Sequence, residues 1–358
     1  MTIVKGHSML AILKPGNMIN GLRTAGLVLA IVVIAAFVQS QHDSFLGINN
    51  LTTLLRSMVA LAMIAFAQKL IILLGEIDLS VGSVYGLTSI TMATLWLGGG
   101  ALPFTLPLIP ALLVSLAIAA FVGLLNGWFV VKARLPSFIV TLGMLNVAEG
   151  LQLLISNAQT FTPAYSDPAP PEWELSIFKA IGQAPLLWNI PSATLWLVAS
   201  FLLFWFIRHR TVFGFRLAAI GGNAEAARIA RLPIVKYKLL VFLISGLMAG
   251  LAGIVDFSYV GSVGPRQAGS LQFSVVAAVV IGGASLAGGR GTIVGTLLGA
   301  ILLSLLTNGL ALMGVGSFAQ LLFIGIVTIG AVWLDQGSQI LIRRAAQRSA
   351  AKREAKSE

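Results

Sequence analysis

Long apolar stretches recur along the whole chain, and short polar segments separate them. A helix of about 20 apolar residues crosses the hydrocarbon core of a bilayer and satisfies its own backbone hydrogen bonds there. The short alternating segments of a membrane β-barrel do not occur in the pattern. The pattern predicts an all-α, polytopic membrane protein with about ten transmembrane helices, at residues 22–40, 51–74, 80–97, 107–131, 137–157, 191–207, 236–257, 273–287, 292–313 and 318–335. The two weakest segments, 80–97 and 273–287, are expected to be broken or re-entrant.

The composition fits a protein embedded in a membrane. Of its 358 residues, 57% are hydrophobic and 10% are charged, whereas soluble domains carry about 25% charged residues. The chain has no cysteine, which excludes disulfides and thiolate metal sites. The three histidines lack metal-ligand spacing, and no Gly-Lys pair exists from which a nucleotide-binding P-loop could be built. We therefore expect no catalytic residues, no metal site and no cofactor bound by this chain.

The distribution of basic residues predicts the orientation in the membrane. Most of the loops that carry lysine and arginine fall on one side of the predicted helices: the basic residues there are Lys132, Arg134, Arg208, Arg210, Arg216, Arg228, Arg231, Lys236, Lys238 and Arg290. The positive-inside rule places this side in the cytoplasm. Both termini and the loop 208–236 are then cytoplasmic, and the loop 158–190 is external. The net charge of +11 thus follows the membrane topology and does not indicate nucleic-acid binding.

Three segments follow from this topology. Residues 1–21 are predicted to be a cytoplasmic N-terminal segment, residues 22–335 the transmembrane domain, and residues 336–358 a basic cytoplasmic tail. Basic segments next to a membrane are attracted by anionic lipid headgroups. Membrane lipids are therefore expected partners of the tail.

Two carboxylates interrupt the apolar pattern in the stretch GEIDLSVGSVYG at 75–86. Acidic side chains at that depth are costly unless they face a partner or a wet cavity, so Glu76 and Asp78 predict part of a transport pathway. Lys69 lies seven residues before Glu76 and shares a helix face with it if the helix continues through Gly75, in which case we expect an ion pair. Glu149 is a further carboxylate within a predicted span. The candidate pathway residues are Glu76, Asp78, Ser80, Tyr85, Thr88, Asn126 and Asn308.

Glycines at four-residue spacing predict close helix packing. This spacing lines one face of a helix and lets two backbones approach each other. The glycines concerned are Gly82 and Gly86, Gly246 and Gly250, and Gly291, Gly295 and Gly299.

The loop 208–236 contains a predicted short helix, Ala224–Arg231. Asn223 is placed to cap its first turn, Glu225 and Arg228 complement the helix dipole, and Pro233 stops it. The helix is either a simple connector or a docking element for a cytoplasmic ATPase. The residues predicted to carry docking are Asn223, Glu225, Ala226, Ala227 and Arg228.

Four stretches together resemble the permease subunits of bacterial ATP-binding cassette sugar importers, the ribose-type family of binding-protein-dependent inner-membrane components. They are GEIDLSVGS at 75–83, LPSFIVTLG at 135–143, GFRLAAIGGNAEAARIA at 214–230 and AVVIGGASLAGGRGTIVGTLLGA at 278–300. The sequence departs from the family at Glu76 and Arg231, where members usually carry glycine.

The resemblance implies a permease that moves a monosaccharide or related small sugar across the bacterial inner membrane. It also implies a second permease copy or paralogue, a cytoplasmic ATPase that acts on ATP and Mg²⁺, and a periplasmic sugar-binding protein. It assigns the Asn223–Arg231 helix to coupling with the ATPase, and the GEIDLS and GGRGT stretches to the translocation path. The alternative is a stand-alone secondary transporter in which Glu76, Asp78 and Glu149 couple transport to protons or sodium.

Overall fold

The described part of the chain is built from helices. The computed structural model describes residues 15–186, 189–267, 269–330 and 333, and within these residues it contains helices and two isolated β-bridges. The predicted segment 1–21 falls largely outside the described residues, and the tail 336–358 lies entirely outside them. The helices are α2 (Pro15–Gln41), α3 (Ile48–Leu73), α4 (Val81–Leu97), α5 (Leu108–Val131), α6 (Ser137–Ser156), α7 (Glu172–Gly182), α8 (Ala193–Arg210), α9 (Val212–Gly222), α10 (Ala224–Ile229), α11 (Ile234–Val260), α12 (Leu271–Ile281), α13 (Ile293–Leu312) and Ser317–Gly330.

Each of the ten predicted spans overlaps one of these helices, although 273–287 continues beyond α12 and 318–335 runs partly outside the described residues. Not every helix is long enough to cross a bilayer. Six described helices have the necessary length and apolar composition, and a seventh span results if α8 and α9, which are bent by 69° relative to each other, count as one. The apolar helices α4, α12 and Ser317–Gly330 are shorter. Non-helical backbone at membrane depth is tolerated where protein surrounds it, so the short helices α4 and α12, which are buried in large part, fit the interior of a bundle. Ser317–Gly330 has no buried residue.

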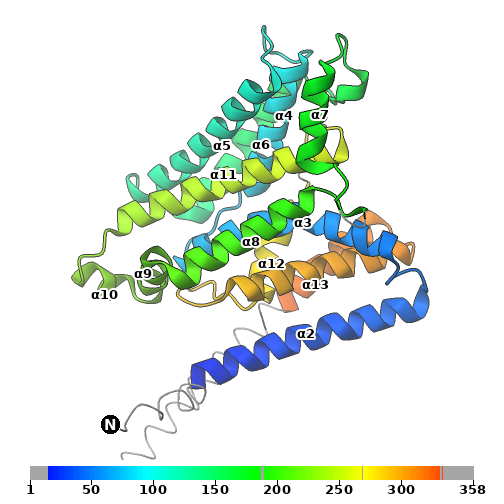
Figure 1. The fold of residues 1–358 in the computed structure, drawn as a ribbon. Helices are drawn as coiled ribbons and strands as arrows, with labels where there is room; N and C mark the ends of the chain where they lie inside the picture. The colour runs from blue at the N-terminus through cyan, green and yellow to red at the C-terminus, as the bar shows by residue number, and fades with distance from the viewer. Residues whose placement is uncertain (1–14, 187–188, 268, 331–332, 334–358) are drawn as a thin grey trace, which may run out of the picture.

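Helices α3, α4 and α11 form the interior of the molecule. Residues 61–73 of α3 and 81–96 of α4 are all buried. Helix α11 packs against α3, α4 and α5 and runs through the middle of the bundle, as Figure 1 shows. Helices α5 and α6 instead expose large apolar side chains such as Phe121, Trp128 and Leu154, which is the surface expected to face lipid.

The two ends of the bundle differ in structure. Figure 1 shows α9 and α10 at one end and α7 at the other. The predicted external loop 158–190 contains α7, which is fixed to the bundle by the buried carboxylate of Glu174. This carboxylate accepts hydrogen bonds from the indole nitrogen of Trp96 and, at 3.2 Å, from the backbone nitrogen of Leu108. Loops that the basic residues assign to the cytoplasm therefore lie away from α7.

Candidate functional site

The break between α3 and α4 is held in place by its own carboxylate. Asp78, 1% exposed, accepts hydrogen bonds from the backbone nitrogen and hydroxyl of Ser80, at 3.0 and 2.7 Å, and from the hydroxyl of Ser245 on α11, at 2.9 Å. The side-chain amide of Gln68 on α3 pairs with the backbone of Asp78. In the orientation that satisfies both amide atoms, the amide oxygen accepts from the backbone nitrogen of Asp78 at 3.2 Å and the amide nitrogen donates to its carbonyl oxygen at 3.3 Å. A buried carboxylate with these partners fixes the backbone of the break.

Side chains of α5 and α6 bind three further polar groups of the break. The backbone nitrogens of Ile77 and Leu79 donate to the hydroxyls of Ser137 and Thr141, at 3.1 and 3.0 Å. Asn126 on α5 donates to the hydroxyl of Ser80 at 2.8 Å. The structure thus brings together three predicted pathway residues, Asp78, Ser80 and Asn126, in a buried hydrogen-bond network that joins α3, α5, α6 and α11.

The predicted ion pair between Lys69 and Glu76 is wrong. Helix α3 ends at Leu73, and Gly75 has a φ of 81°, so the two side chains do not share a helix face. Glu76 pairs with Lys238 on α11 instead. Lys69 is fully buried and donates to the carbonyl oxygen of Arg290 at 2.6 Å, which ties α3 to the loop between α12 and α13.

Three distant stretches of the sequence meet at the end of α3. The backbone nitrogen of Gly289 donates to the carbonyl oxygen of Leu73 at 2.9 Å. Gly221, near the end of α9, packs so closely that an added Cβ would lie 1.8 Å from this same oxygen. A Cβ added at Gly288 would lie 2.7 Å from the carbonyl oxygen of Gly221 and 3.0 Å from the backbone nitrogen of Gly75. We call this contact of Leu73, Gly75, Gly221, Gly288 and Gly289 the glycine junction; it links the break to α9 and to the GGRGT stretch.

Helix α10 follows the glycine junction directly. It spans Ala224–Ile229, two residues shorter than predicted, and the predicted N-cap is confirmed, because the Asn223 side chain accepts from the backbone nitrogen of Ala226 at 2.9 Å. Glu225 and Arg228 form an exposed ion pair at 2.7 Å. Arg231, which departs from the family, has a φ of 57°, the left-handed conformation that glycine favours.

The remaining predicted glycines mostly lie at helix contacts. An added Cβ would fall 2.3 Å from the carbonyl oxygen of Ala119 at Gly246, and 2.6 Å from the Cβ of Ala119 at Gly250. Gly82 and Gly86 approach the amide groups of glutamines 272 and 152, while Gly295 and Gly299 face the backbone of α12 and its C-terminal end. The spacing predicted that Gly291 shares a helix face with Gly295 and Gly299, and this prediction is wrong. Gly291 precedes α13, has a φ of 113° and lies against Lys69.

The other predicted pathway residues lie apart from the break. Tyr85 donates to the carboxylate of Asp256 on α11, which also accepts from Gln267 at 3.2 Å. Thr88 is fully buried and donates to the carbonyl oxygen of Val84 at 2.7 Å. Asn308 exchanges two hydrogen bonds with Asn50, at 2.9 and 3.0 Å. Asp256 was missed from the sequence because it is a single acid in an apolar helix, with no motif around it.

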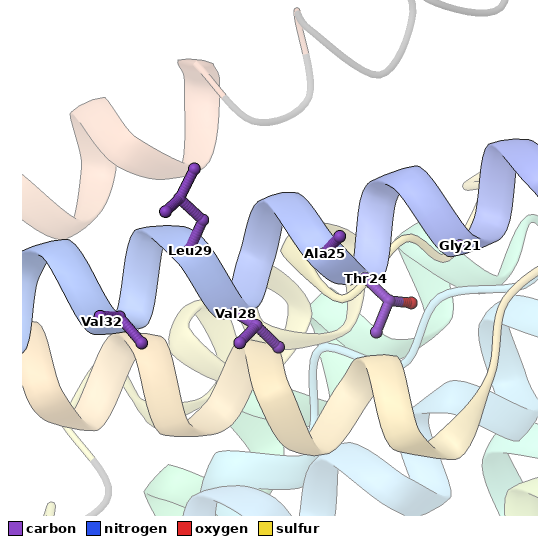
Figure 2. A pocket seen from close by; sticks show the side chains of 6 residues that line it. All are labelled: Gly21, Thr24, Ala25, Val28, Leu29 and Val32. Carbon is purple, nitrogen blue, oxygen red and sulfur yellow. The ribbon is translucent and has the colours of Figure 1, made fainter.

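Two cavities differ in the chemistry of their walls. One, of about 720 Å³, lies along α2 and is lined by Gly21, Thr24, Ala25, Val28, Leu29 and Val32. Figure 2 shows Leu29 pointing away from the side where Val28 and Thr24 lie. The walls are almost wholly apolar, which suits a hydrocarbon chain better than a polar solute. The other cavity, of about 130 Å³, lies between α4, α6 and the start of α12, where Glu149 forms an ion pair with Arg266 at 2.8 Å.

Apolar helices around a discontinuous α3–α4 pair with a buried carboxylate define a multi-pass integral membrane protein of the transport class. Comparison with known proteins specifies the family. Residues 50–332 match the family model described as "Branched-chain amino acid transport system / permease component", and the chain belongs to this family.

Several curated relatives resemble the chain over most of its length. The ribose import permease protein RbsC of Escherichia coli strain K12 is 34% identical, covering 87% of this chain and 93% of the relative. RbsC of Bacillus subtilis strain 168 is 35% identical, covering 87% and 92%. The xylose transport system permease protein XylH of E. coli K12 is 31% identical, covering 87% and 91%. No solved structure matches the chain. The resemblance to ribose-type permeases is confirmed.

Proposed function

We propose that this chain is the permease subunit of an ATP-binding cassette importer that carries a monosaccharide or related small sugar across the bacterial inner membrane. The named functions of the relatives support a sugar as the substrate. The observation that carries the proposal is the glycine junction, because it joins α9, which leads directly into the helix predicted to contact an ATPase, to the broken helix pair in the bundle. A partner subunit hydrolyses the ATP with Mg²⁺, and this chain has no ATPase site of its own.

The proposed topology has ten segments in the membrane, with both termini and the coupling loop 208–236 in the cytoplasm. Two observations support it: the basic residues gather in the loops predicted to be cytoplasmic, and α10 and α7 lie at opposite ends of the bundle. Helix α10 then faces the ATPase. The loop 158–190, including α7, faces the periplasmic sugar-binding protein.

The proposed mechanism moves packed helices between two arrangements. The ATPase subunits close on ATP and displace α10, which is attached to α9 through Asn223. Because Gly221 is in direct backbone contact with Leu73, displacement of α9 moves the end of α3 and the adjoining break. Close-packed interfaces of this kind switch between discrete states and do not deform gradually. The solute passes as the bundle opens first to the outside and then to the cytoplasm, together with a second permease copy or a paralogue.

The coupling assignment is tested with the double variant E225K/A227D. Glu225 is exposed on α10, whereas Ala227 is 4% exposed and belongs to the apolar core. We expect the variant to insert into the membrane but to lose uptake of ribose or xylose and co-purification with the ATPase. E172K, which reverses an exposed charge on α7 at the opposite end, is the control for ATPase co-purification and should retain it. Normal uptake by E225K/A227D would remove α10 from the coupling path.

The alternative of an ion-coupled carrier makes a different prediction. The purified chain in liposomes, with a proton or sodium gradient and no other protein, is expected to be inactive if it is a permease subunit. Solute accumulation under those conditions would refute the proposal and favour the carrier, with its carboxylates as coupling groups.

A further inference from the structure

A cavity of about 440 Å³ lies at the end of the bundle that the basic residues predict to be cytoplasmic. It is bordered by the end of α5, the loop between α5 and α6, the first turns of α11 and the break before α4. Its volume falls within the range of about 300–1,000 Å³ that small-molecule sites occupy. Six of its nine lining residues are apolar and three are charged: Val130, Val131, Leu135, Pro136, Ile234 and Val235, with Glu76, Arg134 and Lys238. The cavity is therefore amphipathic.

The charge in and around this cavity is mostly positive. Glu76 and Lys238 form an ion pair, and an ammonium group has three donors, so Lys238 keeps donors for a second acceptor. Arg134 forms no ion pair within the part of the chain that the structure describes. Lys132 and Lys236, each two residues from a charged lining residue, are exposed. The basic groups outnumber the single carboxylate, so the cavity attracts an anion.

The backbone holds Arg134 beside the end of α5. The φ of Arg134 is 56°, the left-handed region that glycine favours. The backbone nitrogen of Leu135 donates to the carbonyl oxygen of Phe129 at 3.4 Å, which folds the loop back against the helix. Backbone conformations of this kind are unfavourable for a residue with a side chain, and they recur at ligand sites. Here the conformation accompanies a cation in the wall of a cavity.

The cavity adjoins the surface expected to face lipid. Trp128, an exposed residue of α5, lies three residues before Val131, and tryptophan is enriched at the level of the lipid headgroups. Phe138, Ile139 and Leu142 are exposed on α6 at spacings of three and four residues, so they share one helix face. An apolar surface therefore continues from the cavity along α6.

We propose that this cavity binds an anionic phospholipid of the cytoplasmic leaflet. The phosphate accepts hydrogen bonds from Arg134 and Lys238, and the upper part of an acyl chain covers the apolar wall. A neutral sugar gains nothing from the cations, and a soluble anion gains nothing from six apolar residues. The inference goes beyond the proposed function, because it holds whichever solute the chain carries. Only the choice of leaflet rests on the proposed topology.

The test measures lipid binding to the purified full-length chain in detergent by mass spectrometry of the intact complex. Dioleoylphosphatidylglycerol and dioleoylphosphatidylcholine are the probes, because they share acyl chains and differ in headgroup charge. A basic residue near an anionic headgroup changes the affinity about fivefold. The wild-type chain should bind the phosphatidylglycerol at least about fivefold more tightly, and R134G should lower this preference about fivefold.

Two variants separate the guanidinium from the backbone. R134G should fold, because glycine adopts the φ of Arg134 without steric cost. R134K keeps a cation and should retain most of the preference. R231G is the matched control: Arg231 also has a left-handed φ, of 57°, and lies in a loop predicted to be cytoplasmic, but it does not line the cavity. R231G removes the same charge and should leave the preference unchanged.

A soluble headgroup distinguishes the lipid from a free anion. Glycerol 3-phosphate carries the phosphate without acyl chains and should compete at least about tenfold more weakly than phosphatidylglycerol, since it buries no methylene groups. Competition as strong as that of the lipid would overturn the inference in favour of a soluble anion. Equal binding of the two lipids, or equal effects of R134G and R231G, would also overturn it. These measurements need neither ATP nor a transported solute, so their failure is separate from failure of the proposed function.

Discussion

Gly221 offers a sharp test of the glycine junction. Replacement by alanine places a methyl group 1.8 Å from the carbonyl oxygen of Leu73 and 2.9 Å from the backbone nitrogen of Gly289. Both neighbours are backbone atoms, so no side-chain rotation can relieve the clash. Either α9 must move away from α3, or the hydrogen bond between Gly289 and Leu73 must break. G221A is therefore expected to separate the coupling loop from the broken helix pair.

The magnitude follows from the two interactions that the methyl group disturbs. Overpacking a close contact costs about 1–3 kcal/mol, and this contact lies at the severe end of the range. Loss of the 2.9 Å hydrogen bond between Gly289 and Leu73 adds about 1 kcal/mol. The total loss of about 4 kcal/mol is large for a single substitution. It approaches the whole free energy of unfolding of a marginally stable protein.

The neighbouring residue provides a matched control. A Cβ at Gly222 meets no atom within 4 Å, so G222A makes the same chemical change one residue away without a clash. The measurement is the temperature at which half of the purified protein remains folded and monodisperse in detergent, together with the initial rate of ATP-dependent uptake. G221A should lower both strongly, while G222A should retain both. Equal behaviour of the two variants would refute the contact of Gly221 with α3 as a mechanical link.

Three further substitutions test the surrounding structure. D78N removes one carboxyl oxygen from the acceptor of three buried hydrogen bonds and should cost about 1–3 kcal/mol; a thermal midpoint and uptake rate equal to wild type would show that Asp78 is replaceable. N223A removes the cap of α10, a loss of about 1 kcal/mol in a short helix, and should weaken ATPase co-purification, whereas N223S should preserve it. R231G relieves a φ of 57° and should raise the thermal midpoint, by about 1 kcal/mol of stability; an equal rise in R231A, which keeps a Cβ, would contradict this reasoning.

Local features of the fold were predictable from the sequence. Each predicted span contains a helix, since about 20 apolar residues in lipid have few other ways to satisfy their backbone. The Asn223 cap was also predictable, because the groups that form it lie within one turn of each other. The segment 80–97 was expected to be broken or re-entrant, whereas α4 (Val81–Leu97) is a continuous, short, buried helix and the non-helical break lies before it. The ten membrane crossings and the cytoplasmic termini stay predictions.

Partners far apart in the sequence were not predictable. Lys69 was matched with Glu76 on the assumption of a continuous helix, but the left-handed turn at Gly75 sends the chain in another direction. Glu149 had no partner until the fold brought Arg266 to it across more than one hundred residues. Gln152 gave no signal at all, since a single glutamine in an apolar helix has the same sequence pattern whether it faces a cavity or a neighbouring helix.

The amino-acid sequence alone thus determined the helices, the Asn223 cap, the membrane class and the family resemblance, because hydropathy, capping and motif residues act over a few positions. The tertiary structure decided which charges pair and which residues donate hydrogen bonds to Asp78. It also decided that α9, the end of α3 and the loop before α13 are in direct backbone contact. Such contacts depend on the packing of many helices at once. No short stretch of the chain contains the information that sets them.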